Sequence, residues 1–159
     1  MREILFRGRR IDNGAWVEGM YLSQYHSSVF GRIDVIFYSD ECKTHRLPVD
    51  AATVGQFTGL IDKNGKKILE GDILRGFVYP YLSDGHHNYN AEVVWFDDCP
   101  AFGLLTLLAP GAEVHGISTG NTDLIEDDLS DWEIIGNVHD NPKLAGEERE
   151  DADCKGCSQ

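Results

Sequence analysis

Residues 54–74 read VGQFTGLIDKNGKKILEGDIL, and this stretch decides the fold. An Asn-Gly pair at 64–65 lies between apolar pairs at 60–61 and 68–69, and both turn residues tolerate the positive φ that a tight hairpin needs. Gly71 allows a second sharp turn before the next apolar residues. The order predicts a β-hairpin followed by a new strand, as in the core of a sheet or a small barrel.

A second turn of the same kind lies near the N-terminus. The Asp-Asn-Gly run at 12–14 predicts a hairpin between a strand opened by residues 4–6 and a return strand at 15–21. Residues 22–31 are polar. Further strands are predicted at 33–38, 73–79, 91–96, 102–108 and 132–139. We expect the strand at 73–79 to pair with that at 91–96, and the strand at 102–108 to be buried.

Helix is expected to be a minor part of the protein. No window keeps apolar residues at positions i, i+3, i+4 and i+7 over three turns. Asp50 can cap a single helical turn through residues 51–53. Residues 116–131 are expected to form a loop with at most one short helix at 124–129. The predicted fold class is therefore mainly β, built from short-strand hairpins with little helix.

We predict a single domain over residues 1–145. It comprises an N-terminal hairpin region, 1–50, and a barrel-like core, 51–142. A Gly-Asp strand entry like the one in the opening stretch is frequent in small barrels of the SH3-like kind. We therefore predict such a barrel around residues 54–96 and 132–138.

Residues 146–159 are strongly charged and lack large apolar side chains, which predicts a disordered acidic C-terminal tail. Within it, Cys154 and Cys157 have the spacing of half a zinc site or of a redox pair. A closed zinc site needs four ligands, and no second C-x-x-C is present. A redox pair normally lies at the start of a helix, which lowers the thiol pKa. We therefore expect no metal or redox role for this pair.

The charge is acidic and uneven. The chain has 14 Lys and Arg against 27 Asp and Glu, a formal net charge of -13, and this field disfavours broad electrostatic binding to nucleic acid. Basic residues gather at 1–10 and acidic residues at 121–140. Either patch could bind a partner of opposite charge, and the alternative is that both are solvated faces.

The sequence predicts a protein of the cytoplasm. The N-terminus shows no apolar stretch of signal-peptide length, and nowhere do 18 apolar residues run together. Cys42 and Cys99 stand alone, as is usual in a reducing compartment.

Several motifs in order resemble those of one family. They are Arg2-Glu3-Ile4-Leu5-Phe6-Arg7-Gly8, Gly14-Ala15-Trp16-Val17-Glu18-Gly19, residues 53–73 and Ile134-Ile135-Gly136-Asn137-Val138-His139-Asp140-Asn141-Pro142. Together they look like the YopX family of phage and prophage proteins, over roughly residues 1–145. The resemblance implies a mainly β fold and a phage or prophage origin, and hence a bacterial host cell. It implies no activity, because it brings no catalytic or ligand-binding residues with it.

The polar, aromatic loop at 80–90 is the expected surface for a variable contact. His86 and His87 are adjacent, so on an extended segment they point to opposite faces and do not share a metal. With the tyrosines around them they form a candidate partner-contact surface, and a solvated loop is the alternative. The candidate residues are Tyr79, Tyr81, His86, His87 and Tyr89.

No motif predicts a catalytic, metal or cofactor site. Asp62 and Gly65 superficially resemble a calcium loop, but the EF-hand spacing is not met. Paired acids at 97–98 and 126–128 could hold a divalent metal, yet adjacent acids are expected by chance in so acidic a chain. Trp16, Trp95 and Trp132 are interpreted as core or subunit-interface residues rather than as a platform for stacking bases.

Three functions follow from these patterns. The first is a non-enzymatic phage or prophage accessory protein that acts through protein contacts and forms a homo-oligomer. The second is an acidic regulatory inhibitor whose face at 121–140 covers the basic surface of a nucleic-acid-binding protein. The third is a metal-dependent enzyme that uses the acids at 97–98 and 126–128, and it is the least favoured.

Overall fold

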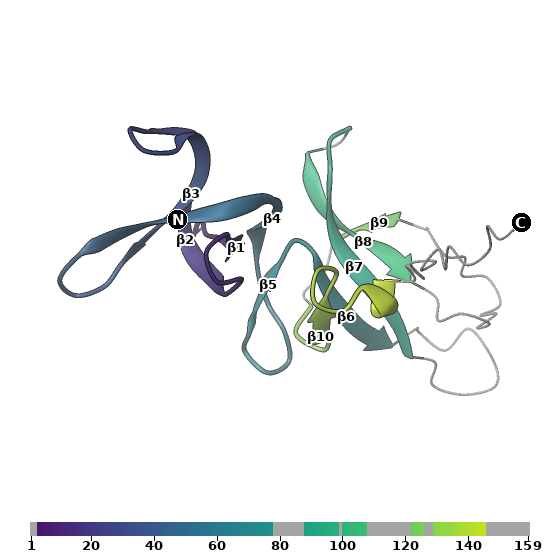
Figure 1. Ribbon diagram of the computed structural model, residues 1–159. Coiled ribbons are helices and arrows are strands. Elements are labelled where there is room, and N and C mark those ends of the chain that lie inside the picture. The colour runs from purple at the N-terminus through teal and green to yellow at the C-terminus, as the bar shows by residue number, and fades with distance from the viewer. Residues whose placement is uncertain (1–2, 78–87, 99, 108–121, 126–128, 146–159) are drawn as a thin grey trace, which may run out of the picture.

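A computed structural model describes residues 3–77, 88–98, 100–107, 122–125 and 129–145, and it contains two five-stranded antiparallel sheets (Figure 1). The first sheet comprises β1 (Phe6–Arg10), β2 (Trp16–Ser27), β3 (Gly31–Ser39), β4 (Thr44–Ile61) and β5 (Lys67–Leu69). The second comprises β6 (Asp72–Phe77), β7 (Asn88–Phe96), β8 (Ala101–Leu107), β9 (Thr122–Leu124) and β10 (Glu133–Asn137). A 3-10 helix, η1, spans Pro142–Ala145. The predicted mainly β fold class is confirmed.

The first four strands close into a ring of pairings, which we call the strand ring. β1 pairs with both β2 and β4, and β3 lies between β2 and β4. Closure is possible because β2 and β4 are long, with 12 and 18 residues, so each pairs with different neighbours along its length. The fully buried Ile36 and Val49 lie inside, beside Gly8, where a Cβ would come within 3.1 Å of Ile36.

The predicted helical turn at 51–53 is wrong, because β4 continues through these residues as a bulged strand. Arg7 lies opposite Gly55 and Arg9 opposite Asp50, so four residues of β4 face a single residue of β1. The Asp50 carboxylate does accept the Ala52 N–H, at 3.0 Å, as a cap would. Thr53 then accepts the Arg9 N–H at 2.9 Å, which holds the chain beside β1 and prevents a helix from continuing.

The polar residues 22–31 are largely strand rather than a separate segment. β2 runs to Ser27 and β3 starts at Gly31, whose φ of 74° lets the hairpin turn. A bulge near Gln24, with φ of 51°, shifts the register, and the Asp34 carboxylate accepts the Gln24 N–H at 3.1 Å.

The two turns of the opening stretch are as predicted. Gly65 and Gly71 have φ of 76° and 81°, and the hairpin closes with the Gly65 N–H donating to the Asp62 carbonyl at 2.9 Å. The predicted pairing of the strands at 73–79 and 91–96 is confirmed by β6 and β7, with Ile73 opposite Glu92. The turn at 12–14 likewise joins β1 to β2.

The second sheet carries the main hydrophobic core. β8 is mostly buried, as predicted for 102–108. β10, the last strand, pairs with β6, which comes from the middle of the sequence. The buried residues of this core are Ile68, Leu74, Ala91, Val93, Phe102, Leu104 and Leu129. The short helix proposed at 124–129 is wrong at its start, because Leu124 ends β9, which pairs with β8. Residues 126–128 and the tail at 146–159 lie outside the described residues.

The SH3-like form proposed around residues 54–96 and 132–138 stays a prediction. These residues contribute to both sheets, because the second half of β4 and β5 belong to the first sheet, whereas β6, β7 and β10 belong to the second. The strand ring lies mostly before the predicted barrel, in the segment assigned to N-terminal hairpins, but β4 continues into the barrel segment and pairs with β1 at Gly55 and Gln56. Its closure depends on a contact between β1 and β4, whose paired residues lie 39 to 50 positions apart in sequence.

Candidate functional site

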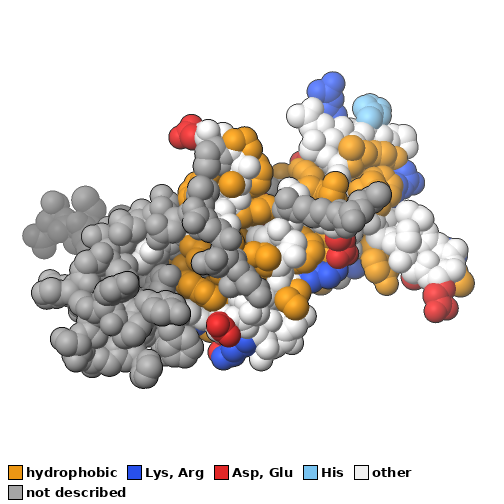
Figure 2. Space-filling view, turned by 180° about the vertical axis from the view of Figure 1, so that it is seen from behind, with side chains coloured by type: hydrophobic (Ala, Val, Ile, Leu, Met, Phe, Trp, Pro, Cys, Tyr) orange, Lys and Arg blue, Asp and Glu red, His pale blue; other side chains and the backbone are white. Residues whose placement is uncertain are grey.

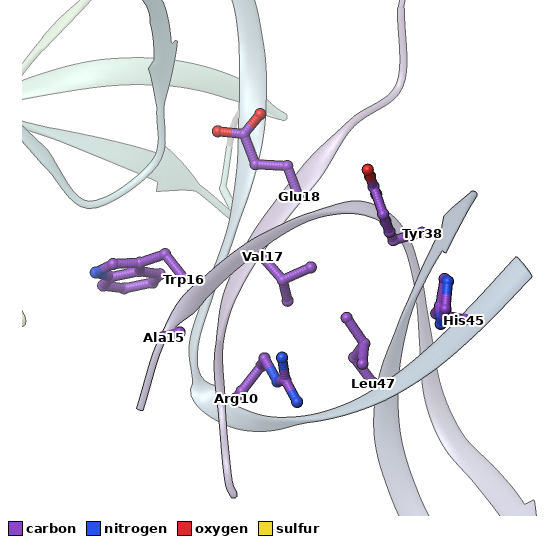
Figure 3. A pocket seen from close by; sticks show the side chains of 8 residues that line it. All are labelled: Arg10, Ala15, Trp16, Val17, Glu18, Tyr38, His45 and Leu47. Atoms are coloured by element: carbon purple, nitrogen blue, oxygen red, sulfur yellow. The ribbon is translucent and has the colours of Figure 1, made fainter. Parts of the chain in front are cut away.

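The open end of the strand ring is a pocket, which we call the ring mouth. Its volume is about 450 Å³, and it is lined by residues from all four strands of the ring and from the turn before β2. Val17 and Leu47 form its apolar floor, with the Arg10 side chain beside them, and Tyr38 and His45 stand on the opposite side (Figure 3). Ala15, Trp16 and Glu18 complete the lining.

The register explains why these side chains meet. Val17 pairs with Gly8, and Leu47 pairs with Ile36, so both point to the inner face that carries the buried residues of the ring. Positions two residues further along each strand share that face, which places Arg10 and Tyr38 above the same interior. The mouth is therefore the outward continuation of the ring core.

Charged groups at the rim of the mouth are paired with exposed acids. Arg10 contacts Asp12 at 2.5 Å, and His45 contacts Asp40 at 2.8 Å. The Cys42 N–H, the His45 ring and the Lys43 N–H all donate to Asp40, and they lower its pKa to about 2. The His45 ring also stacks on Tyr38, with 6.1 Å between centroids. The rim is thus ordered, while the Arg10 and His45 side chains remain partly exposed to solvent.

The second cavity, about 400 Å³, is a groove along the β2–β3 hairpin. Arg46 lies over the ring of Tyr25, and the Ser27 hydroxyl accepts the N–H groups of Val29 and Phe30. This cap fixes the tip of the hairpin with both apolar side chains outward, because Val29 is 77% and Phe30 70% exposed. Met20 and Leu22 of β2 are also exposed, at 70% and 46%, and we call these four residues of the β2–β3 hairpin the hairpin patch.

Hydrophobic side chains are also visible at the surface of the first sheet in the space-filling view, at the right of Figure 2. Exposed large apolar side chains that gather on one element favour an interaction surface over a solvated face.

The two sheets meet at a network of charged and aromatic side chains, which we call the joint. Two guanidinium groups lie close to the Trp16 indole, with its ring centroid 5.0 Å from Arg7 Cζ and 5.6 Å from Arg9 Cζ. Asp140 accepts both the Trp16 indole N–H and an Arg9 N–H, each at 2.8 Å. Arg7 reaches the buried Asp72 at 2.5 Å. β1 and β2 are thereby fastened to β6 and to the segment after β10.

His139 makes this joint sensitive to acid. Its ring lies 5.9 Å from Trp16, and burial together with the Arg9 and Arg7 charges lowers the His139 pKa below its usual 6.5. The unfolded chain therefore takes up this proton more readily than the folded one, so the free energy of unfolding should fall as pH falls below about 6.5. Urea unfolding between pH 7.5 and 5 should show this loss in the wild type but not in His139→Asn. An unchanged slope in that variant would contradict the assignment, and His26→Asn, at an exposed position, serves as control.

The predicted contact residues are only partly placed. Tyr79, Tyr81, His86 and His87 lie outside the described residues, and Tyr89 belongs to β7, with its side chain outside the description. The ring mouth was missed because its members come from separate strands and share no motif. The Asp-Asn-Gly turn at 12–14 predicted the hairpin but not the strands that lie beside it.

The tryptophans have three different environments. Trp132 packs against the core of the second sheet, as the core interpretation predicts. Trp16 belongs to the joint, and Trp95 is 41% exposed with an edge-on contact to Phe102. Trp95 is therefore not a core residue, and the subunit-interface alternative for it stays a prediction.

The described residues contain no group of three or more metal-ligating side chains. Asp97 and Asp98 are exposed after β7, and Asp62 caps the central hairpin instead of forming a calcium loop. Cys42 is an exposed free thiol, whereas Cys99, Cys154 and Cys157 lie outside the description. Within the described ranges, no helix is long and apolar enough to cross a membrane.

Comparisons with known proteins relate the chain to a solved structure and to a protein family. The crystal structure of protein EF1440 from Enterococcus faecalis is similar at 21% identity, covering 91% of this chain and 99% of that one, with a TM-score of 0.48. No match was found among curated proteins. The model of the family described as YopX protein matches residues 5–145, which include every described strand and confirm the resemblance seen in the sequence. The chain therefore belongs to the YopX family.

Proposed function

We propose that the protein is a non-enzymatic phage or prophage accessory protein that acts through protein contacts in the cytoplasm of a bacterial host. The observation that supports this proposal is the hairpin patch: a fixed hairpin tip that presents Val29 and Phe30 to solvent at 77% and 70% exposure. Burying two such side chains against a partner stabilises a complex by about 3 to 6 kcal/mol before the costs of association.

The alternatives have less support in the described residues. Two acids of the face at 121–140 already form ion pairs within the protein: Glu133 pairs with Lys63 at 2.7 Å and Asp140 with Arg9 at 2.8 Å. An inhibitor that covers a basic surface would need such acids free. The metal-dependent enzyme would need specific uptake of Mg²⁺, Mn²⁺ or Zn²⁺, which calorimetry can detect.

A paired substitution tests the proposal. Tagged wild-type protein and a Val29→Asp/Phe30→Asp variant are used to capture partners from a lysate of the host that carries the prophage. We expect the variant to lose the captured protein at least about tenfold, because two desolvated apolar contacts become charges. The melting temperature should stay unchanged, since both side chains are exposed.

The matched control places the same charges elsewhere on the surface. Ile11 and Ile61 are 64% and 49% exposed and lie away from the hairpin tip, so Ile11→Asp/Ile61→Asp should keep the partner. Equal capture by all three proteins would refute contact through the hairpin patch. A second copy of the chain is the first partner to examine, and a strict monomer by light scattering at micromolar concentration would remove the homo-oligomer.

A further inference from the structure

The ring mouth lies beside a strand edge that no other strand covers in the described part of the chain. Arg10 N–H donates to the Ala15 carbonyl at 2.9 Å, so this is a hydrogen-bonded pair of the β1–β2 ladder. Such pairs alternate along an antiparallel ladder, so the backbone groups of Trp16 and Glu18 point away from β1. The Arg9 N–H confirms the alternation, because it points to Thr53 of β4 and not to β2.

The side to which Trp16 and Glu18 point is the side of β3, but the described pairing of β2 with β3 starts only at Met20 and Phe37. The register would place Glu18 opposite Ser39, where β3 pairs with Thr44 of β4 alone. The two strands therefore part next to the ring mouth. Four consecutive residues, 15–18, line the pocket on this side, so the pocket runs along the strand edge (Figure 3).

The side chains in the pocket define what an added strand would carry. A residue opposite Val17 would point inward, over the apolar floor of Val17 and Leu47. A neighbouring inward residue would face Arg10, whose guanidinium carries a positive charge. The acid that now pairs with Arg10, Asp12, is 59% exposed, so an incoming carboxylate can share or replace it at low cost.

We propose that the ring mouth binds an extended peptide segment of a partner protein, which adds as a strand to β2 at Trp16–Glu18. Its apolar side chain enters over Val17 and Leu47, and a carboxylate two residues along meets Arg10. The backbone supplies affinity through hydrogen bonds, and the pocket supplies specificity. This inference rests on the proposed function, in which the protein acts through contacts with other proteins. It assigns one class of partner, an extended peptide segment, to the ring mouth, a surface separate from the hairpin patch.

The distal part of β2 is a poorer place for such an addition. The bulge at Gln24 interrupts its edge, and bulges at sheet edges prevent strand pairing. No register shift is recorded between β1 and β2 over Trp16–Gly19.

The test uses the full chain, labelled with ¹⁵N, and the blocked peptide acetyl-Thr-Val-Thr-Asp-Thr-amide. Its threonines would pair with the β2 backbone, while Val and Asp point inward. At millimolar peptide we expect amide shifts at Trp16, Val17 and Glu18 and around Tyr38 and Leu47. N-methylation of the central Thr removes a backbone donor and should weaken binding about tenfold.

Two substitutions examine the side-chain contacts. Val17→Thr keeps the volume but places a hydroxyl on the floor, and should weaken binding about fivefold, whereas Ile11→Thr on the exposed turn should not. Replacing the peptide Asp by Asn should weaken binding to the wild type but not to Arg10→Gln, because the two changes remove the same contact.

Shifts confined to the ring mouth, with the losses described, support the inference. No shifts, shifts centred on the hairpin patch, or equal binding of the N-methylated peptide would overturn it. The proposed function fails separately, because it depends on partner capture through Val29 and Phe30. If the peptide does not bind while a partner is still captured through the hairpin patch, only this inference is refuted.

Discussion

Replacing Asp62 with alanine is expected to lower the free energy of unfolding by about 3 kcal/mol. The Asp62 side chain is 2% exposed, and its carboxylate accepts three backbone N–H groups: those of Asn64 at 2.8 Å, Lys66 at 2.9 Å and Ile134 at 3.2 Å. The first two close the central hairpin, and the third ties it to β10. Alanine leaves all three donors without this acceptor.

The same carboxylate gives the prediction a pH dependence. Burial works to raise the Asp62 pKa, but the N–H groups of Lys66, Ile134 and Asn64 outweigh it, so the pKa lies below 3.8. A depressed carboxyl pKa contributes stability above the unfolded value, and that contribution is lost as pH falls through the folded value. The difference between wild type and Asp62→Ala should therefore be full at pH 7 and shrink below about pH 4.

Urea unfolding at 25 °C measures the loss, and two further variants make it specific. Asp62→Asn retains one oxygen for the hairpin but points an amide at the Ile134 N–H, so an intermediate loss is expected. Asp12→Ala changes an exposed acid in the other Asn-Gly turn and should cost much less than Asp62→Ala. If Asp62→Ala costs no more than Asp12→Ala, the capping role is refuted.

Replacing Arg7 with methionine is expected to cost about 3 to 5 kcal/mol. The Arg7 side chain is 17% exposed and Asp72 only 1%, and their contact at 2.5 Å joins the two sheets. Asp72 also accepts the Leu69 N–H at 2.9 Å. Removal of Arg7 leaves a buried carboxylate without its counter-ion, beside the Glu18 charge that already opposes its ionisation.

The pKa of Asp72 shifts in the opposite direction to that of Asp62. Burial raises the Asp72 pKa even though Arg7 works to lower it, and loss of Arg7 raises it further. A raised carboxyl pKa contributes stability at low pH that is lost as pH rises through the folded value. The loss in Arg7→Met should thus be largest at pH 7 and smaller near pH 4, because Asp72 takes up a proton.

The double variant Arg7→Met/Asp72→Asn separates ion pairing from packing. It removes the unpaired charge but keeps an acceptor for Leu69 N–H, so it should recover more than half of the loss. Arg10→Met is the matched control, because its partner Asp12 is exposed, and it should cost less than about 0.5 kcal/mol. Equal losses in the single and the double variant would show that Arg7 stabilises by packing on Trp16 instead.

Local chemistry made some features of the site predictable. The turn at 12–14 placed Ala15 and Val17 at the start of a return strand. Gly14 has a φ of 70°, and few residues other than glycine adopt this positive φ, which the turn requires. The Ser27 cap, the Asp50 bulge and the Gln24 bulge were not predicted. Each depends on a hydrogen bond between a side chain and a nearby backbone group. The same bond can occur in a turn, a bulge or a helix, and the neighbouring strands decide which of these forms.

By itself, the sequence determined that the chain is mainly β, where its Asn-Gly turns fall and which family it belongs to, because turn geometry and alternation act over a few residues. The tertiary structure alone decided that β1 closes a ring with β4, that Trp16 joins two sheets, and that Val17, Tyr38 and Leu47 surround one pocket. Those contacts join residues far apart in the chain, and their free energy arises only when the whole set of strands has paired and excluded water.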